Sequence, residues 1–299
     1  MRRIKIRGEQ EVEKGEIQFK KPQMCLACER TGGVHRREYR LHGCRVCRTQ
    51  EWRNGERVGY ATVHFDPLAL SVGDAARGRQ DPVRAVADLL AHTAKQLAPD
   101  ARCVLVACLG NQRITPDSLG PGTARALEVT RHVQLLDSGA FSRFGKPALC
   151  AVAPGVLGDT GIEAAELVRG AVRQVGAQLV IAVDALAASR PEHLGAAVQI
   201  SDRGLRPGAG AGNRRVAVDA KSVGCPVISL GMPTVIASGT LICDALLRAG
   251  ICGVGEELDK HLSSVEHYLV APADIDVTIS RSAKLLADAI GACFGLGNA

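Results

Sequence analysis

Residues 103–111 read CVLVACLGN, and residues 115–121 read TPDSLGP. The first six residues are apolar without alternation, which is typical of a strand covered on both faces, and the glycine and asparagine after them tolerate the positive φ of a tight turn. The threonine and proline that follow fit the cap and first turn of a helix, so the pattern predicts Asp117 at a helix amino terminus. Ligands of α/β sheets bind at the carboxyl ends of strands, which makes Asp117 a candidate site residue. The alternative is that its carboxylate only complements the helix dipole.

A second carboxylate follows another apolar run. Residues 179–183 read LVIAV and lead directly into Asp184, 67 positions after Asp117. If both runs are strands of one sheet, the two carboxyl groups converge at its carboxyl edge. Two carboxyls that approach closely share a proton and can activate water, so Asp117 and Asp184 are predicted as the catalytic pair of a hydrolase.

Strand-like and helix-like segments alternate along most of the chain. Caps and apolar spacing predict helices over 82–97, 159–175, 238–249 and 275–290, and apolar runs predict strands at 60–65, 149–153, 197–200, 227–230 and 267–270. The alternation favours an α/β fold, a three-layer, mostly parallel sheet with helices on both faces. Glu163 falls in the first turn of the second helix, either as a complement to the helix dipole or as a third acid near the site.

The first part of the chain carries a specific cysteine pattern. Cys25 and Cys28 are followed after 15 residues by Cys44 and Cys47, and this C-x2-C-x15-C-x2-C spacing is typical of two knuckles that hold a zinc ion. Four thiolates close the tetrahedral shell, so the predicted zinc is a structural cofactor and takes no part in catalysis. A metal-free pair of knuckles is the alternative. The other seven cysteines lie in or beside apolar segments and are expected to be buried free thiols.

Positive charge is concentrated in the same region. The whole chain has a formal net charge of +6, whereas residues 1–60 alone hold 15 Lys and Arg against 8 Asp and Glu. We therefore expect a basic, zinc-ribbon-like module over residues 1–58 and an α/β domain over residues 59–299. The basic part is a candidate for weak contact with nucleic acid, but an aromatic content of 3% gives little support for base stacking.

Several other classes of protein are disfavoured. No apolar run approaches the ~20 residues of a membrane span, and the start MRRIKIR lacks the apolar core of a signal peptide, so we expect a cytoplasmic protein without membrane contact. The Gly-rich stretch 201–214 lacks the Gly-Lys-Ser/Thr ending of a phosphate loop, so no nucleotide cofactor is expected. Small residues near strand ends suit the rim of a substrate site instead. The predicted rim consists of Asn111, Asp202, Gly208 and Gly212.

Short motifs in a fixed order resemble the germination protease family, the spore endopeptidases that degrade small acid-soluble spore proteins. The resemblance is dense from about residue 103 to 245. The motifs are LGN at 109–111, TPDSLGP at 115–121, TRH at 130–132, APGVL at 153–157, TGIE at 160–163, IAVDAL at 181–186, QISD at 199–202, PG at 207–208, GN at 212–213 and GMPTV at 231–235.

The resemblance implies a phosphorylase/hydrolase-like fold related to the hydrogenase maturation proteases. It also implies peptide hydrolysis by two aspartates, which fall on Asp117 and Asp184. Members of the family are made as zymogens, lose a propeptide and assemble as tetramers, so a homo-oligomer in the forespore or spore core is expected. Residues 1–100 depart from the family pattern.

Two further readings use the same residues differently. In the first, the chain is a metal-dependent, maturation-type protease in which Glu163 or His132 supplies a third contact beside the two aspartates. In the second, it is a non-catalytic scaffold, and the zinc-ribbon-like module binds nucleic acid or protein.

Overall fold

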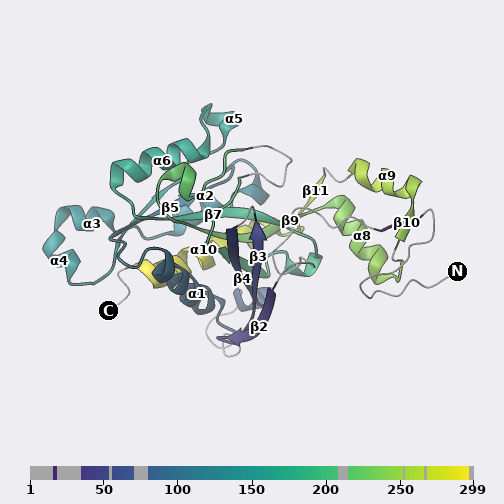
Figure 1. Ribbon diagram of the computed structural model, residues 1–299, viewed down its shortest axis with the longest axis horizontal. Helices are drawn as coiled ribbons and strands as arrows, with labels where there is room; N and C mark the ends of the chain where they lie inside the picture. Colours follow the sequence, from purple (N-terminus) through teal and green to yellow (C-terminus); the bar gives the residue numbers. More distant parts are fainter. Residues whose placement is uncertain are drawn as a thin grey trace.

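The computed structural model describes residues 16–18, 35–53, 56–70, 80–207, 215–251, 253–265 and 268–295. A nine-stranded sheet forms its centre, with strand order β2-β3-β4-β8-β9-β7-β5-β6 and with β11 paired to the carboxyl end of β9 (Figure 1). The strands are β2 (His35–Leu41), β3 (Cys44–Arg53), β4 (Glu56–His64), β5 (Cys103–Cys108), β6 (Ala148–Val152), β7 (Leu179–Ala188), β8 (Ala197–Ser201), β9 (Val227–Ala237) and β11 (Leu269–Val270).

The sheet is mixed, so the prediction of a mostly parallel sheet is wrong. β5 pairs in parallel with β6 and β7, and β7 pairs in parallel with β9. Every pair from β9 through β8, β4 and β3 to β2 is antiparallel. β2 and β3 are joined by His42 and Gly43, whose φ angles of 47° and 77° form a two-residue turn. Such a turn joins only antiparallel strands, because a parallel neighbour needs a long crossover.

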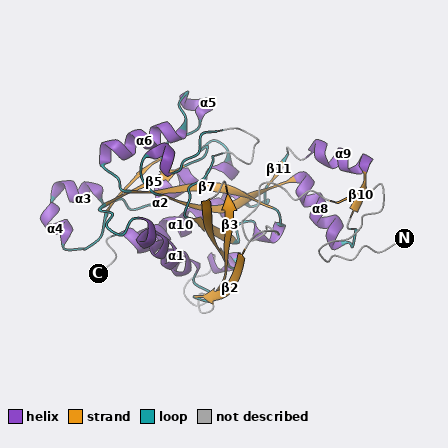
Figure 2. Ribbon diagram, in the orientation of Figure 1, coloured by secondary structure: helices purple, strands orange, loops and turns teal. Residues whose placement is uncertain are grey.

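Helices cover both faces of the sheet (Figure 2). One face packs against α1 (Pro82–Leu97), α2 (Leu119–Ala126) and α10 (Ile275–Phe294), and the other against α6 (Ala164–Val175) and α7 (Ala220–Val223). α1 forms where the sequence predicts it, because Asp81 caps the helix by accepting a hydrogen bond from the Arg84 N–H (3.0 Å). Within the described ranges, no helix combines the length and the apolar character that a membrane crossing requires.

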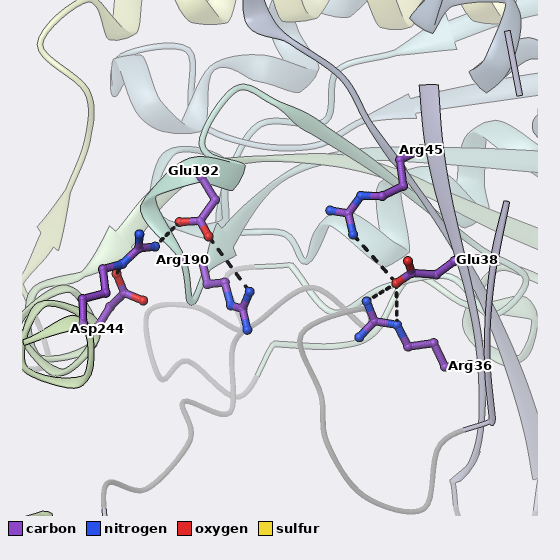
Figure 3. A network of polar contacts seen from close by, with 7 residues as sticks. Arg36, Glu38, Arg45, Arg190, Glu192 and Asp244 are labelled. Atoms are coloured by element: carbon purple, nitrogen blue, oxygen red, sulfur yellow. Dashed lines mark hydrogen bonds and ion pairs between the residues drawn. The ribbon is translucent and has the colours of Figure 1, made fainter. Parts of the chain in front are cut away.

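The remaining elements are short or lie at one end of the molecule. Three helices and three 3-10 turns flank the sheet: α3 (Arg131–Leu136), α4 (Ser138–Ser142), α5 (Leu157–Thr160), η2 (Pro67–Leu70), η3 (Thr115–Asp117) and η4 (Pro191–His193). A small lobe projects beyond β9 (Figure 1). It contains α8 (Ser238–Arg248), α9 (Glu256–Val265) and the strand pair β1 (Glu16–Gln18) and β10 (Gly253–Gly255). Arg248 of α8 pairs at 2.6 Å with Glu192 of η4, which is labelled in Figure 3, and thereby links the lobe to the body.

The central strands form a dry core that fixes the position of the site. All six residues of β5 are buried, and each large side chain taken from water contributes about 1.5–3 kcal/mol. α2 approaches β5 so closely that a Cβ on Gly120 would lie 2.0 Å from the carbonyl oxygen of Leu109. The end of β5 and the start of α2 are therefore held in contact, with the Asp117 loop between them.

The amino-terminal strands belong to the central sheet. The predicted boundary between residues 58 and 59 falls inside β4, which pairs with β3 on one side and β8 on the other. The described residues from His35 onward therefore extend the sheet and do not form a separate module. Cys25 and Cys28 lie outside the described residues.

Candidate active site

Asp117 lies in the short loop between β5 and α2. It ends the 3-10 turn η3, and Ser118 then serves as the N-cap of α2, so the predicted helix begins two residues after Asp117. The N–H of Asn111 donates both to Oδ2 of Asp117 (2.8 Å) and to its backbone carbonyl (3.1 Å). Gly110 has a φ of 116°, and a Cβ there would lie 2.1 Å from the Asp117 carbonyl oxygen. The glycine and the Asn111 N–H therefore set the position of the carboxylate.

Asp184 lies within β7 and not at its end. β7 pairs with β5 only as far as Val183, whose carbonyl accepts a hydrogen bond from the Leu109 N–H (2.8 Å), but it stays paired with β9 through Ala188. Asp184 is therefore the first residue of β7 beyond the end of β5, next to the loop that carries Asp117. It is 6% exposed, and its Oδ1 accepts a hydrogen bond from the Ala185 N–H (3.0 Å).

The two carboxyl groups have raised pKa values for related reasons. The pKa of Asp184 is raised to about 8: burial is the largest cause, the charge of Asp117 adds to it, and the hydrogen bond from the Ala185 N–H acts in the opposite direction. Burial also raises the pKa of Asp117, against the effect of the Asn111 N–H. Because Asp184 feels the charge of Asp117, Asp117 ionises first. With a pKa of about 8, Asp184 keeps its proton to a higher pH than Asp117 does.

A cleft of about 530 Å³ opens beside the Asp117 loop. Its wall comes from the turns that follow β5 and β6: Gly110, Asn111, Gln112, Arg113, Pro121, Ala153, Gly155 and Asp159. Arg113 and Asp159 form an ion pair across it at 3.5 Å. The cleft volume is in the range of ligand sites, so a substrate segment has room next to the acid pair.

Asn111, which the sequence predicts at the substrate rim, lines this cleft, and so do Arg113 and Asp159, which were not predicted. Both follow the end of a predicted strand within a few residues, and that position was the available signal. Asp202 is not among the residues that line this cleft; its Oδ1 accepts a hydrogen bond from the Gly59 N–H (3.1 Å), which ties the end of β8 to β4. Gly208 and Gly212 lie outside the described residues.

Glu163 and His132, the predicted candidates for a third contact beside the two aspartates, lie at a helix cap and on a helix surface. Glu163 is the N-cap residue of α6, and its N–H donates to Oε2 of Glu166 (3.3 Å), as expected for a helix cap. His132 lies exposed on α3. The preceding Thr130 bonds to Leu149 near the amino end of β6, the end opposite the cleft. The structure therefore does not bring His132 to the acid pair.

The described cysteines do not have the geometry of a zinc knuckle. Cys44 and Cys47 are consecutive in the motif but lie three positions apart on the straight strand β3, so their side chains face opposite sides of the sheet. Each is buried, Cys44 among the residues under α1 and Cys47 beside Ala197 and Leu186. In the part of the chain that the structure describes, no three His, Cys, Asp or Glu side chains cluster so as to hold a metal ion. The four-cysteine zinc site stays a prediction, since its first pair lies outside that part.

The chain matches known proteins over most of this region. A sequence model described as germination protease matches residues 63–259. The chain belongs to the germination protease family. It is similar to the germination protease of Caldanaerobacter subterraneus subsp. tengcongensis, with 44% identity over 72% of this chain and 66% of that protein. It is also similar to the germination protease of Clostridium perfringens, with 36% identity over 64% of this chain and 66% of that protein. The chain thus spans just under two thirds of the length of these relatives.

A solved structure of low similarity was also found. It is the [NiFe] hydrogenase maturation protease HycI from Thermococcus kodakarensis KOD1, with 14% identity and a TM-score of 0.33 over 68% of this chain and 98% of that one. At this level of similarity it carries no argument about the site of this germination protease family member.

Proposed function

We propose that this germination protease family member is an endopeptidase that hydrolyses peptide bonds with Asp117 and Asp184. The observation that supports the proposal best is the position of the buried Asp184 carboxyl, at the first residue of β7 beyond the end of β5, next to the loop that carries Asp117 and the cleft beside it. Burial and the charge of Asp117 raise the pKa of Asp184, so Asp117 is the more acidic of the two. One group is then a base and the other an acid at the same pH, as acid-base catalysis requires.

The proposed reaction has two steps. In the first, Asp117 takes a proton from water while the water oxygen bonds to the peptide carbonyl carbon and Asp184 gives its proton to the carbonyl oxygen. In the second, Asp117 gives its proton to the leaving nitrogen, the C–N bond breaks, and Asp184 recovers a proton from a hydroxyl of the intermediate. Both carboxyls return to their starting states, so no other reactant is needed.

The substrates we propose are small acid-soluble spore proteins, cleaved during germination. The family membership and the printed name of the relatives support this substrate class. Propeptide removal, assembly as a homo-oligomer and a location in the spore core belong to the same proposal and rest on the same resemblance.

The test is cleavage of a purified small acid-soluble spore protein, followed by mass spectrometry of the fragments. We expect Asp117→Asn and Asp184→Asn each to lower the rate by about 10²–10⁴, the usual contribution of an acid or base. Asp202→Asn is the matched control, because Asp202 lies outside the pair and the amide oxygen can still accept the bond from Gly59. A cleavage rate equal to that of the wild type in either Asp117→Asn or Asp184→Asn would refute the proposal. Loss of activity with a chelator, restored by one metal, would favour the metal-dependent reading.

A further inference from the structure

A transverse row of side chains leads from Asp184 across the antiparallel half of the sheet. In register, Asp184 of β7 lies opposite Gly231 of β9, Gly231 opposite Gln199 of β8, Gln199 opposite Thr62 of β4, and Thr62 opposite Cys47 of β3. Residues opposite each other in a sheet point to the same face. The five positions therefore form one continuous row on the face that carries the Asp184 carboxyl.

Three hydroxyl groups on this face have no hydrogen-bond partner among the described residues. They belong to Thr62, Thr49 and Ser201. Thr49 and Ser201 lie in the next row across the sheet, on either side of Tyr60 of β4. The exposed fractions are 0% for Thr62, 1% for Thr49 and 2% for Ser201. A buried hydroxyl without a partner is costly, so three on adjacent strands, on the face of the sheet that carries the Asp184 carboxyl, point to a ligand that pairs with them. We call Thr49, Thr62 and Ser201 the hydroxyl strip.

Charged side chains from β2 and β3 lie beside the hydroxyl strip. Glu38 accepts a hydrogen bond from Nε of Arg36 (2.8 Å) and forms an ion pair with Arg45 at 3.8 Å. Figure 3 draws these three side chains. Burial raises the pKa of the Cys47 thiol, the neighbour of Thr62 in the row, and the nearby charge of Arg36 opposes this rise. These ionic side chains are between 41% and 47% exposed, and ion pairs of this kind are weak. They can therefore rearrange when a ligand approaches.

We propose that the hydroxyl strip binds the backbone of an extended substrate polypeptide on one side of the scissile bond. The inference rests on the proposed protease function. Ser201 lies two strands and two residues from Asp184, and Thr62 lies three strands away. With strands about 4.8 Å apart and about 3.4 Å per residue, the strip begins about 12 Å from the reacting atoms and reaches Thr62 at about 14 Å. An extended chain covers that span in about four residues. The hydroxyls would then pair with peptide N–H and C=O groups about four residues from the bond that is cut.

The experiment compares two buried, unpaired serines. Ser201→Ala removes a hydroxyl of the strip, and Ser282→Ala removes one from α10, on the other face of the sheet. Both are made in the full chain carrying Asp184→Asn, so that peptides bind without being cut. The probes are 12-residue fluorescent peptides tiled over a small acid-soluble spore protein, with the tightest binder then shortened one residue at a time from each end. Binding is measured by anisotropy, and Tm by thermal unfolding.

We expect Ser201→Ala to weaken peptide binding about 2- to 10-fold, which is the range of one hydrogen bond. In the reference chain, affinity should fall when the peptide loses the residue about four positions from the cleavage site on one side. In Ser201→Ala this fall should be absent. Both variants should raise Tm by about 2–4 °C, because each removes an unpaired group, and Ser282→Ala should leave binding unchanged.

Equal affinity of the Ser201→Ala and reference chains at every peptide length would overturn the proposal. A fall in Tm for Ser201→Ala would overturn it too, because the hydroxyl would then already have a partner such as a bound water. Peptides that bind but are not cut by the wild-type chain would count against the protease function alone, since the binding comparison does not depend on cleavage.

Discussion

Asp184→Asn should make this germination protease family member more stable at alkaline pH while removing the peptidase activity proposed for it. In the folded chain the pKa of Asp184 is raised from 3.8 to about 8, so between these pH values the folded state binds more protons than the unfolded state. Stability therefore falls as pH rises through that window, by about 1.36 kcal/mol per pH unit, and is lowest above pH 8. The total is roughly 6 kcal/mol, of which roughly 4 kcal/mol is lost between pH 5 and pH 9. An asparagine carries no charge, so the variant escapes this loss.

The assay is urea unfolding of the wild-type and variant chains at pH 5, 7 and 9. The free energy of unfolding of Asp184→Asn, relative to wild type, should increase by roughly 4 kcal/mol from pH 5 to pH 9. Any constant cost of burying the amide cancels in this comparison. Asp117→Asn should show a smaller increase, because it removes the charge that raises the pKa of Asp184. Parallel stability curves for wild type and Asp184→Asn would refute the placement of Asp184 as a buried, protonated acid.

Three further predictions concern the site and its support. The cleavage rate should fall as pH rises past about 8, where Asp184 loses the proton it donates, and a rate that is flat from pH 7 to 10 would contradict this assignment. Gly120→Ala should lower the free energy of unfolding by about 1–3 kcal/mol, because the new Cβ would meet the Leu109 carbonyl oxygen. Gly170→Ala on α6 should raise the free energy of unfolding by about 0.5–1 kcal/mol, because its Cβ would meet no atom within 4 Å. Urea unfolding measures both changes. Cys44→Ser should lower the free energy of unfolding by the same amount with and without a chelator, because the variant buries a hydroxyl in an apolar cluster. If metal analysis shows that the variant holds one zinc ion fewer per chain than the wild type, the zinc knuckle is supported instead.

Local signals in the sequence were sufficient for the elements that they define. α1 begins at its Asp81 cap, and β5 coincides with the apolar run 103–108. α10 buries Ile279, Leu286 and Ile290 on one side, as their spacing predicts. In each case the information lies within a few residues, because caps and periodic burial depend on near neighbours along the chain.

Strand ends and strand partners depend on the rest of the sheet and were predicted less well. β9 was expected to end before Gly231, yet it continues to Ala237 past a proline. Pro233 is tolerated because the ladder between β7 and β9 shifts register between Leu186 and Ala187, opposite this stretch. The hairpin from β2 to β3 was missed although His42 and Gly43 mark its turn. The sequence analysis gave more weight to the zinc-type spacing of the cysteines than to this turn. On the strand that follows the turn, Cys44 and Cys47 are three residues apart, so their thiols lie on opposite faces of the sheet.

The error at Asp184 and the chemistry proposed for it have the same physical origin. A charged aspartate is not expected inside a buried strand, so the sequence pattern places the strand end there. β7 nevertheless continues through this position, because a carboxyl whose pKa is about 8 is neutral at pH 7 and can remain buried without a paired charge. The neutral carboxyl is also the form that can donate a proton to a peptide carbonyl. The feature that makes Asp184 compatible with a strand is therefore the one that allows it to act as the acid of the pair.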